Sequence, residues 1–191
     1  MSVTSAKSGA TGISLALDNN YMEPIATVLV GSGGVNQITF NDIPQTYKHL
    51  QIRGISRGDS SNANLAWNAN GDASSANYAC HILRGNGASV FSEAITSGSF
   101  NSFIISNEFS NLSGDTSNAF GGGAIDILDY SNTNKYKTAR SVAGRDLNGS
   151  GAVTVTSNLW MNAAAISSIK LYLVNGNFIQ YSRFSLYGIK G

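Results

Sequence analysis

The chain has 191 residues, with 12 Lys and Arg against 11 Asp and Glu, and a net charge of +1. This length corresponds to one domain, large enough to bury a core without metal or disulfide support. The balanced charge excludes the strong positive field of nucleic-acid-binding proteins and the polybasic patch of membrane-binding ones, so we expect neither partner. Charged residues make up only 12%, against about 25% in an average chain. The Gly-rich, Pro-poor composition instead predicts short strands joined by tight turns.

The N-terminal part differs from the rest of the chain. Its first dozen residues are small and polar and lack the apolar segment of a signal peptide. Ile13, Leu15 and Leu17 then alternate with smaller or polar residues, a pattern typical of an extended segment that covers a surface. We therefore predict an N-terminal arm over residues 1–22 and a single domain over residues 23–191. The three apolar side chains either bind a partner or fold back onto the chain's own sheet.

Strand patterns fill the first two thirds of the domain. The predicted strands cover residues 25–30, 35–40, 47–52, 64–67, 77–84 and 100–105. Leu50 and Ile52 are expected to face inward, with Gln51 and Arg53 outward. Gly54 is expected to mark a bulge or bend. Residues 110–123, rich in Ser, Asn and Gly, are predicted to form a long loop.

The last third has the strongest strand signal. Its predicted strands cover residues 124–130, 135–143, 152–159, 169–174 and 178–189. Residues 174–178, with Asn-Gly-Asn at their centre, predict a hairpin, and residues 162–166 are a candidate for one helical turn. Helices of the length that parallel α/β folds require are missing from the pattern. The sequence therefore predicts an all-β fold, a single β-sandwich or jelly roll with an N-terminal extended arm.

Few residues are suited to catalysis. The two histidines are His49 and His81, and His81 directly follows Cys80 in a predicted strand, so these two side chains should point to opposite faces. Asp126 and Asp129 are likewise expected on opposite faces of one strand. No Cys or His cluster has the spacing of metal ligands. We therefore expect no catalytic residue, no metal, no cofactor and no enzymatic activity.

Three motifs resemble binding sites, and each has a structural interpretation. Arg57-Gly58-Asp59 spells an adhesion tripeptide, and residues 68–72 (NANGD) resemble part of a calcium loop. We expect both to be turns. In residues 68–72 the glycine comes one position too early for a calcium-binding loop, and no Glu stands at the closing position. Aromatic residues could form a sugar-binding platform, although core packing is the commoner role. The aromatic candidates are Trp67, Tyr130, Tyr136, Trp160 and Tyr172.

Three segments carry a resemblance to known proteins. They are residues 23–34 (EPIATVLVGSGG), 43–53 (IPQTYKHLQIR) and 180–191 (QYSRFSLYGIKG). Together they resemble small virion structural proteins of tailed bacteriophages, of the type that infects cyanobacteria and marine bacteria. The resemblance implies a place in the virion, after assembly in the host cytoplasm, and carries over no catalytic residue. Residues 56–120 lie outside it.

The resemblance leaves two main roles open. The first is a capsid decoration (cement) protein that bridges major capsid protein subunits, as a homo-oligomer expected to be a trimer, with Ile13, Leu15 and Leu17 as partner-binding residues. A net charge near zero suits many copies packed side by side. The alternative is a tail fibre, spike or baseplate appendage that binds host surface glycan through loops within residues 56–120. A polysaccharide-degrading enzyme is a third, weaker interpretation.

Overall fold

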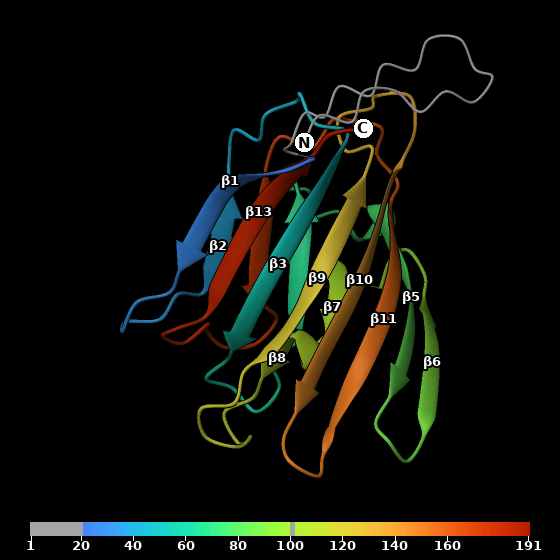
Figure 1. The fold of residues 1–191 in the computed structure, drawn as a ribbon. Helices are drawn as coiled ribbons and strands as arrows, with labels where there is room; N and C mark the ends of the chain where they lie inside the picture. The colour runs from blue at the N-terminus through green and yellow to red at the C-terminus, as the bar shows by residue number, and fades with distance from the viewer. Residues whose placement is uncertain (1–20, 100–101) are drawn as a thin grey trace, which may run out of the picture.

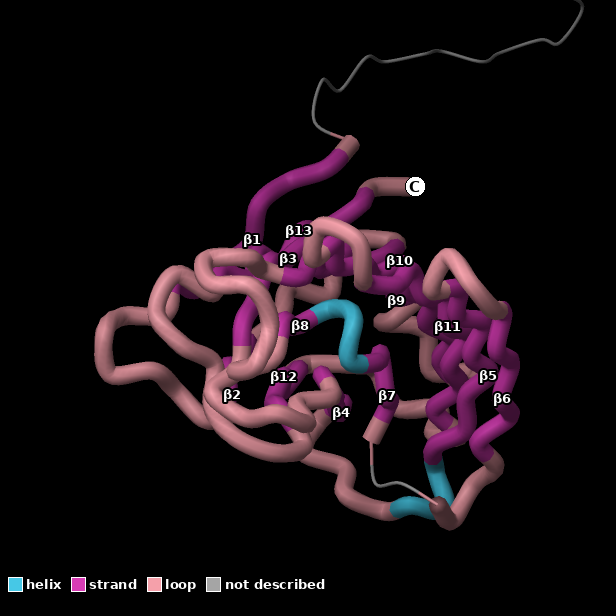
Figure 2. The backbone as a smooth tube through the Cα atoms, turned by 90° about the horizontal axis from the view of Figure 1, so that it is seen from below, coloured by secondary structure: helices cyan, strands magenta, loops and turns pink. Residues whose placement is uncertain are grey.

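The computed structural model describes residues 21–99 and 102–191. Two sheets face each other and enclose the core (Figure 1 and Figure 2). The large sheet has the strand order β1-β13-β3-β9-β10-β11-β5-β6, with the short β8 parallel to β3, and the small sheet has the order β2-β12-β4-β7. All other pairings are antiparallel, so the predicted all-β sandwich is confirmed.

The elements have the following bounds. The strands are β1 Met22–Leu29, β2 Gln37–Phe40, β3 His49–Arg57, β4 Leu65–Ala69, β5 Tyr78–Gly85, β6 Val90–Ile95, β7 Phe103–Ser106, β8 Ser110–Asn111, β9 Gly121–Leu128, β10 Lys137–Asp146, β11 Gly151–Trp160, β12 Ile169–Leu173 and β13 Arg183–Ile189. Two 3-10 turns, η1 Ser75–Asn77 and η2 Asn107–Phe109, complete the described chain.

The core lies between the two sheets and follows the alternation seen in the sequence. In β3, Leu50 and Ile52 are fully buried, and the large sheet meets Ile169 and Leu171 of β12 across the core. Each such side chain stabilises the fold by about 1.5–3 kcal/mol relative to exposure. Aromatic rings add shape-specific contacts within the sandwich, such as the stacking of Trp67 on a neighbouring ring at 4.2 Å between centroids.

The two ends of the described chain meet at one end of the sandwich, which we call the terminal pole (Figure 1). β1 pairs with β13 from Met22 opposite Ile189, and the Lys190 N–H donates to the Tyr21 carbonyl at 3.0 Å. The ammonium of Lys190 also lies 2.7 Å from the carboxylate of Glu23. β1 begins one residue before the predicted start of the domain. Ile13, Leu15 and Leu17 lie outside the described residues.

The opposite end, the loop pole, carries residues 112–120 and the hairpin turns at 86–89 and 147–150 (Figure 1). Residues 110–123 are only partly a loop, because β8 takes their first two positions and β9 begins at Gly121. Two positions in β9, Gly121 and Gly123, need glycine. A Cβ at these positions would lie 2.6 and 2.3 Å from backbone oxygens of neighbouring segments.

The bulge predicted at Gly54 is wrong. β3 pairs through this position with both β13 and β9 without a shift in register. The reason for glycine is instead close packing, because a Cβ at residue 54 would lie 2.4 Å from the ring of Phe184. Residues 162–166, a candidate for a helical turn, form an extended connection without helix.

The hairpin predicted at residues 174–178 is also wrong. β12 belongs to the small sheet and β13 to the large one, so the turn carries the chain from one layer to the other. Asp59 holds this turn by accepting hydrogen bonds from the backbone N–H and the amide Nδ2 of Asn177. These two bonds lower the pKa of Asp59 below its usual value.

Candidate functional site

The outer face of the large sheet carries apolar side chains where water-facing polar ones are usual. In β10 and β11, Val142, Val153 and Val155 are 55%, 58% and 46% exposed. Leu83 of β5 and Val90 of β6 extend the set. We call these five residues the apolar outer patch. They lie on neighbouring strands, because Val155 is opposite Val142 on one side and Leu83 on the other.

The inner face of the same strands combines buried apolar residues, such as Ala139, Ala143 and Trp160, with buried polar ones. Thr154 and Thr156 alternate with the exposed valines and are each only 1% exposed. Thr156 shares a 2.6 Å hydrogen bond with the Ser141 hydroxyl and accepts another from Asn158 Nδ2. Over Val153–Thr156 of β11 the usual arrangement of an antiparallel sheet, apolar inside and polar outside, is therefore reversed.

A buried carboxylate explains the reversal. Glu108 of η2 is 1% exposed and lies between the sheets, where an unpaired charge would be costly. Arg84 Nε donates to its Oε1 at 2.7 Å, and Thr154 Oγ1 donates to its Oε2 at 3.0 Å. Arg84 and Thr154 therefore face inward as donors to Glu108, and Val153 and Val155, which alternate with Thr154, face outward.

A groove of about 560 Å³ crosses β10, β11, β5 and β6 and contains Leu83 and Val155 of the patch. Its apolar lining residues are Ile82, Leu83, Ala94 and Val155. The polar residues that line it are His81, Ser92, Glu93, Arg140, Thr156 and Ser157. Apolar surface of this kind with a polar rim is typical of a site that binds another molecule.

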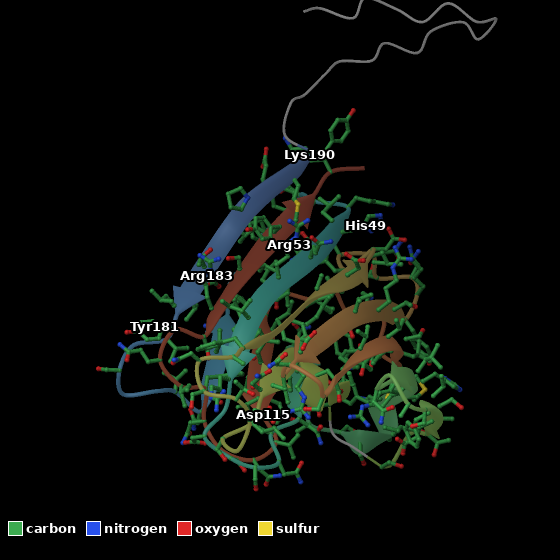
Figure 3. The ribbon with its side chains drawn as sticks, turned by 60° about the horizontal axis from the view of Figure 1, so that its bottom comes forward. His49, Arg53, Asp115, Tyr181, Arg183 and Lys190 are labelled. Carbon is green, nitrogen blue, oxygen red and sulfur yellow. The ribbon has the colours of Figure 1, made fainter. Side chains whose placement is uncertain are left out.

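The other half of the outer face is mostly polar and internally paired, although Leu29 and Ile55 are exposed there. Arg53 Nε donates to Gln51 Oε1 at 2.6 Å and its guanidinium lies 5.8 Å from the ring centroid of Tyr187. Asp126 accepts from Gln51 and lies 3.5 Å from the guanidinium of Arg140. Figure 3 labels Arg53 together with Arg183 over the β3–β13 part of the sheet, away from the patch.

The adhesion tripeptide is part of the scaffold. Arg57 is the last residue of β3 and is 8% exposed, and its guanidinium donates to four carbonyl oxygens of the 112–120 loop at 2.7 to 3.3 Å. A partner could not reach this side chain. Burial of Arg57 argues against an adhesion site. The expected turn is wrong, however, because Arg57 ends β3 and Gly58 forms a bridge with Phe178.

In residues 68–72, the first two positions belong to β4 and a turn follows at Asn70 and Gly71. The carboxylate oxygens of Asp72 are occupied by protein donors. Asp72 accepts from Trp160 Nε1 at 2.7 Å, from Asn77 Nδ2 at 2.8 Å and from the Ser74 N–H at 2.9 Å. Burial raises the pKa of Asp72, but these hydrogen bonds outweigh it and leave the pKa lowered. Among the described residues, no three His, Cys, Asp or Glu side chains stand together as a metal site would require.

The structure separates the polar residues considered for catalysis. Cys80 is buried and His81 is exposed on the opposite face of β5, as predicted. His49 is half-buried and its Nδ1 accepts the backbone N–H of Asp129 at 2.9 Å. Asp129 lies in the turn after β9 with φ of 46°, so placing it in one strand with Asp126 was wrong. Lys135 and Lys48 hydrogen-bond to the Asp129 carboxylate and lower its pKa.

The aromatic candidates for sugar binding are mostly core residues. Trp67, Tyr130 and Trp160 are at most 1% exposed, and the Tyr130 hydroxyl donates to the Pro44 carbonyl. Tyr136 is 55% exposed, and Tyr172 lies beside the Lys170 ammonium at 5.4 Å. The five residues do not form one platform, since most of them face the interior.

In the sequence, Val153 and Val155 alternate with Thr154 and Thr156, which predicts a strand but does not show which of the two sets faces the interior. Valine and threonine are both β-branched and similar in volume, so either set suits either face of a strand. The deciding residue is Glu108, a carboxylate directly followed by Phe109, but the sequence around it does not show that it is buried.

No family model matches the chain, and neither the curated proteins nor the solved structures searched contain a match. Among the residues that the structure describes, no helix has the length and apolar character needed to span a membrane.

Proposed function

We propose that this chain is a non-catalytic structural protein of a phage virion, a capsid decoration protein that binds capsid subunits through its apolar outer patch. The observation that carries the proposal is the reversal in β10 and β11, where valines 46–58% exposed face outward and threonines face the interior. Exposed apolar clusters of this kind usually mark an interaction surface. A permanent neighbour would remove these side chains from water.

The three segments that resemble phage virion proteins support the proposal by their position. Residues 23–34 contain most of β1, residues 43–53 contain the first half of β3, and residues 180–191 contain β13. These strands are direct neighbours in the order β1-β13-β3, at one side of the large sheet. The resemblance thus falls on one contiguous unit, whereas the apolar outer patch occupies the other side.

The arm predicted from the sequence would supply a second contact. Burial of Ile13, Leu15 and Leu17 on a neighbour would contribute about 1.5–3 kcal/mol for each side chain. Two weak contacts on one capsid lattice add by avidity, so neither contact alone has to be strong.

The glycan-binding alternative fits the site less well. A sugar platform uses exposed aromatic rings, but the apolar residues that line the groove on the outer face are Ile82, Leu83, Ala94 and Val155. Three of the five aromatic candidates lie in the core. We therefore place the tail or baseplate role second.

The test is immunogold electron microscopy of intact particles of the virus that carries this gene, with antibody raised against the chain. Gold spread over the head is the expected result. Gold confined to the tail tip would favour the appendage role, and unlabelled particles would contradict a place in the virion altogether.

A binding assay on particles stripped of the protein separates the two contacts. We expect the triple variant Val142→Thr, Val153→Thr, Val155→Thr to fold normally and to lose at least tenfold in affinity. A chain that lacks residues 1–20 should lose affinity through the arm alone. The matched control changes Arg53 and Arg183 to Gln on the polar half of the same face and should bind like the parent.

A further inference from the structure

β6 is an unprotected edge of the large sheet. It pairs with β5 on one side only, and within the part of the chain that the structure describes no strand pairs with its other side (Figure 1). Its first five residues are exposed, with Val90 at 77% and Phe91 at 50%. Such an edge is a template for pairing with another strand.

The opposite edge of the same sheet is protected. β1 contains Pro24, which has no N–H to donate, and its register with β13 shifts between Pro24 and Ala26. Proline and irregular register are the devices that prevent edge-to-edge pairing. β6 has the sequence VFSEAI, without proline, lysine or a register shift, so the two edges differ in kind.

The free backbone groups of β6 can be assigned from its hairpin. The Asn86 N–H donates to the Ser89 carbonyl, and hydrogen-bonded pairs alternate with non-bonded ones along an antiparallel ladder. Phe91, Glu93 and Ile95 therefore bond to β5. Val90, Ser92 and Ala94 present their N–H and C=O groups to the free side.

We propose that β6 pairs antiparallel with β6 of a second copy of this chain, about a two-fold axis at Ser92. This register sets Ser92 opposite Ser92 and Val90 opposite Ala94, so the residues with outward N–H and C=O groups meet each other. Phe91 lies opposite the partner's Glu93. The register one step further along would set Glu93 opposite Glu93, and like charges directly opposite are destabilising.

The pairing joins two large sheets into one and is self-complementary, as a two-fold interface requires. It also brings the Val90 end of each apolar outer patch to the seam, where Val90 is covered by Ala94 of the second copy. The inference concerns the purified chain and stands apart from capsid binding, so either proposal can fail without the other.

The first test is the mass of the purified full chain by sedimentation velocity over a range of concentrations. We expect a concentration-dependent dimer. Ser92→Pro, which removes one outward N–H from an edge strand, should give a folded monomer by circular dichroism. The matched control Ser92→Ala keeps the N–H and should remain dimeric.

The second test reads the register directly and does not depend on the proline variant. Paired Cα atoms at a hydrogen-bonded position are about 5.5 Å apart, within the range that a disulfide spans. Ser92→Cys should therefore form a disulfide-linked dimer on oxidation, while Ser97→Cys, in the exposed turn after β6, should not. A monomer at every concentration, a trimer, or a dimer that Ser92→Pro leaves intact would overturn the proposal.

Discussion

Arg57 shows how a single side chain can define a whole loop. Its guanidinium donates hydrogen bonds to four carbonyl oxygens of the 112–120 segment, which water would otherwise have to hydrate. Nearby, Arg145 Nη1 donates to the Asp115 carboxylate at 2.6 Å and holds the same segment from β10. The loop pole is thus ordered by two arginines, in a chain with few charged residues.

Replacement of Arg57 by Lys should be costly although the charge is kept. A lysine ammonium is a point donor and cannot reproduce the planar fork of guanidinium. We expect Arg57→Lys to lower the free energy of unfolding by about 2 kcal/mol, measured by urea denaturation. Hydrogen exchange should show lost protection across residues 112–120. The control is Arg53→Lys on the outer face of the same strand, expected within about 0.5 kcal/mol of the parent; equal effects at both sites would contradict the role of Arg57.

Asp72 predicts a specific dependence of stability on pH. Because its folded pKa lies below the reference value of 3.8, it stabilises the fold above pH 3.8, and this contribution is lost as the pH falls through the folded pKa. Asp72→Asn places an NH₂ group near donors such as Trp160 Nε1. We expect it to lower the free energy of unfolding by about 1–2 kcal/mol at neutral pH. Denaturation curves measured from pH 7 downward should show that the difference in free energy of unfolding between this variant and the parent becomes smaller below pH 3.8. A difference that stays constant as the pH falls below 3.8 would contradict this role of Asp72.

At the scale of the element, β11 is a strand whose two faces are exchanged relative to the usual sandwich. Thr156 is 1% exposed and its hydroxyl has two hydrogen-bonding partners, whereas Val155 is 46% exposed. In an apolar core, a Thr→Val substitution that removes an unpaired hydroxyl would leave the stability of the fold unchanged or raise it. Here it would leave the Ser141 hydroxyl and the Asn158 Nδ2 group without their hydrogen-bonding partner.

We therefore expect opposite exchanges at adjacent positions to have unequal effects. Thr156→Val should lower the free energy of unfolding by about 1–3 kcal/mol, because a buried donor is left unsatisfied. Val155→Thr should change it by less than about 0.5 kcal/mol. Thermal or urea unfolding of the two variants decides the matter, and a stabilised Thr156→Val would refute the reversed orientation of the strand.

At the scale of the whole molecule, the protection of backbone amides from hydrogen exchange should decrease from the centre of the large sheet to its β6 edge. β9 and β10 are paired on both sides, whereas β6 is paired on one. Local openings need less free energy where fewer contacts are broken. In dilute protein, hydrogen exchange of β9 and β10 amides should require global unfolding, and β6 amides should exchange through a smaller opening. Uniform protection across the sheet would contradict this gradient.

The sequence predicted the fold class well where one face of a strand was clearly apolar. β3, β12 and β13 follow this rule, because Leu50, Leu171 and Leu186 alternate with polar neighbours and are fully buried. β6 was not predicted at all, since Ser, Glu and Ala have low strand preference and its residues are exposed. It is a strand because β5 pairs with it.

The candidate surface was less predictable than the fold. The outward direction of Val153 and Val155 depends on Glu108, which comes from a distant part of the chain and is placed by η2. The turn at 174–178 had the residues of a hairpin but joins two sheets, a choice made by the pairing of β13 with β3. Both features depend on contacts between remote segments, which local patterns do not contain.

The pairing of β1 with β13 has a mechanical consequence. Tyr21 and Lys190 lie side by side at the terminal pole. A force that pulls these two residues apart is therefore in the unzipping geometry, and it breaks the β1–β13 hydrogen bonds one after another. A force applied between residue 21 and the loop pole instead acts along β1 and loads its register pairs together, in shear. A molecule tethered through its N-terminal segment and pulled from the far end would therefore resist extension much better than one pulled by its two ends.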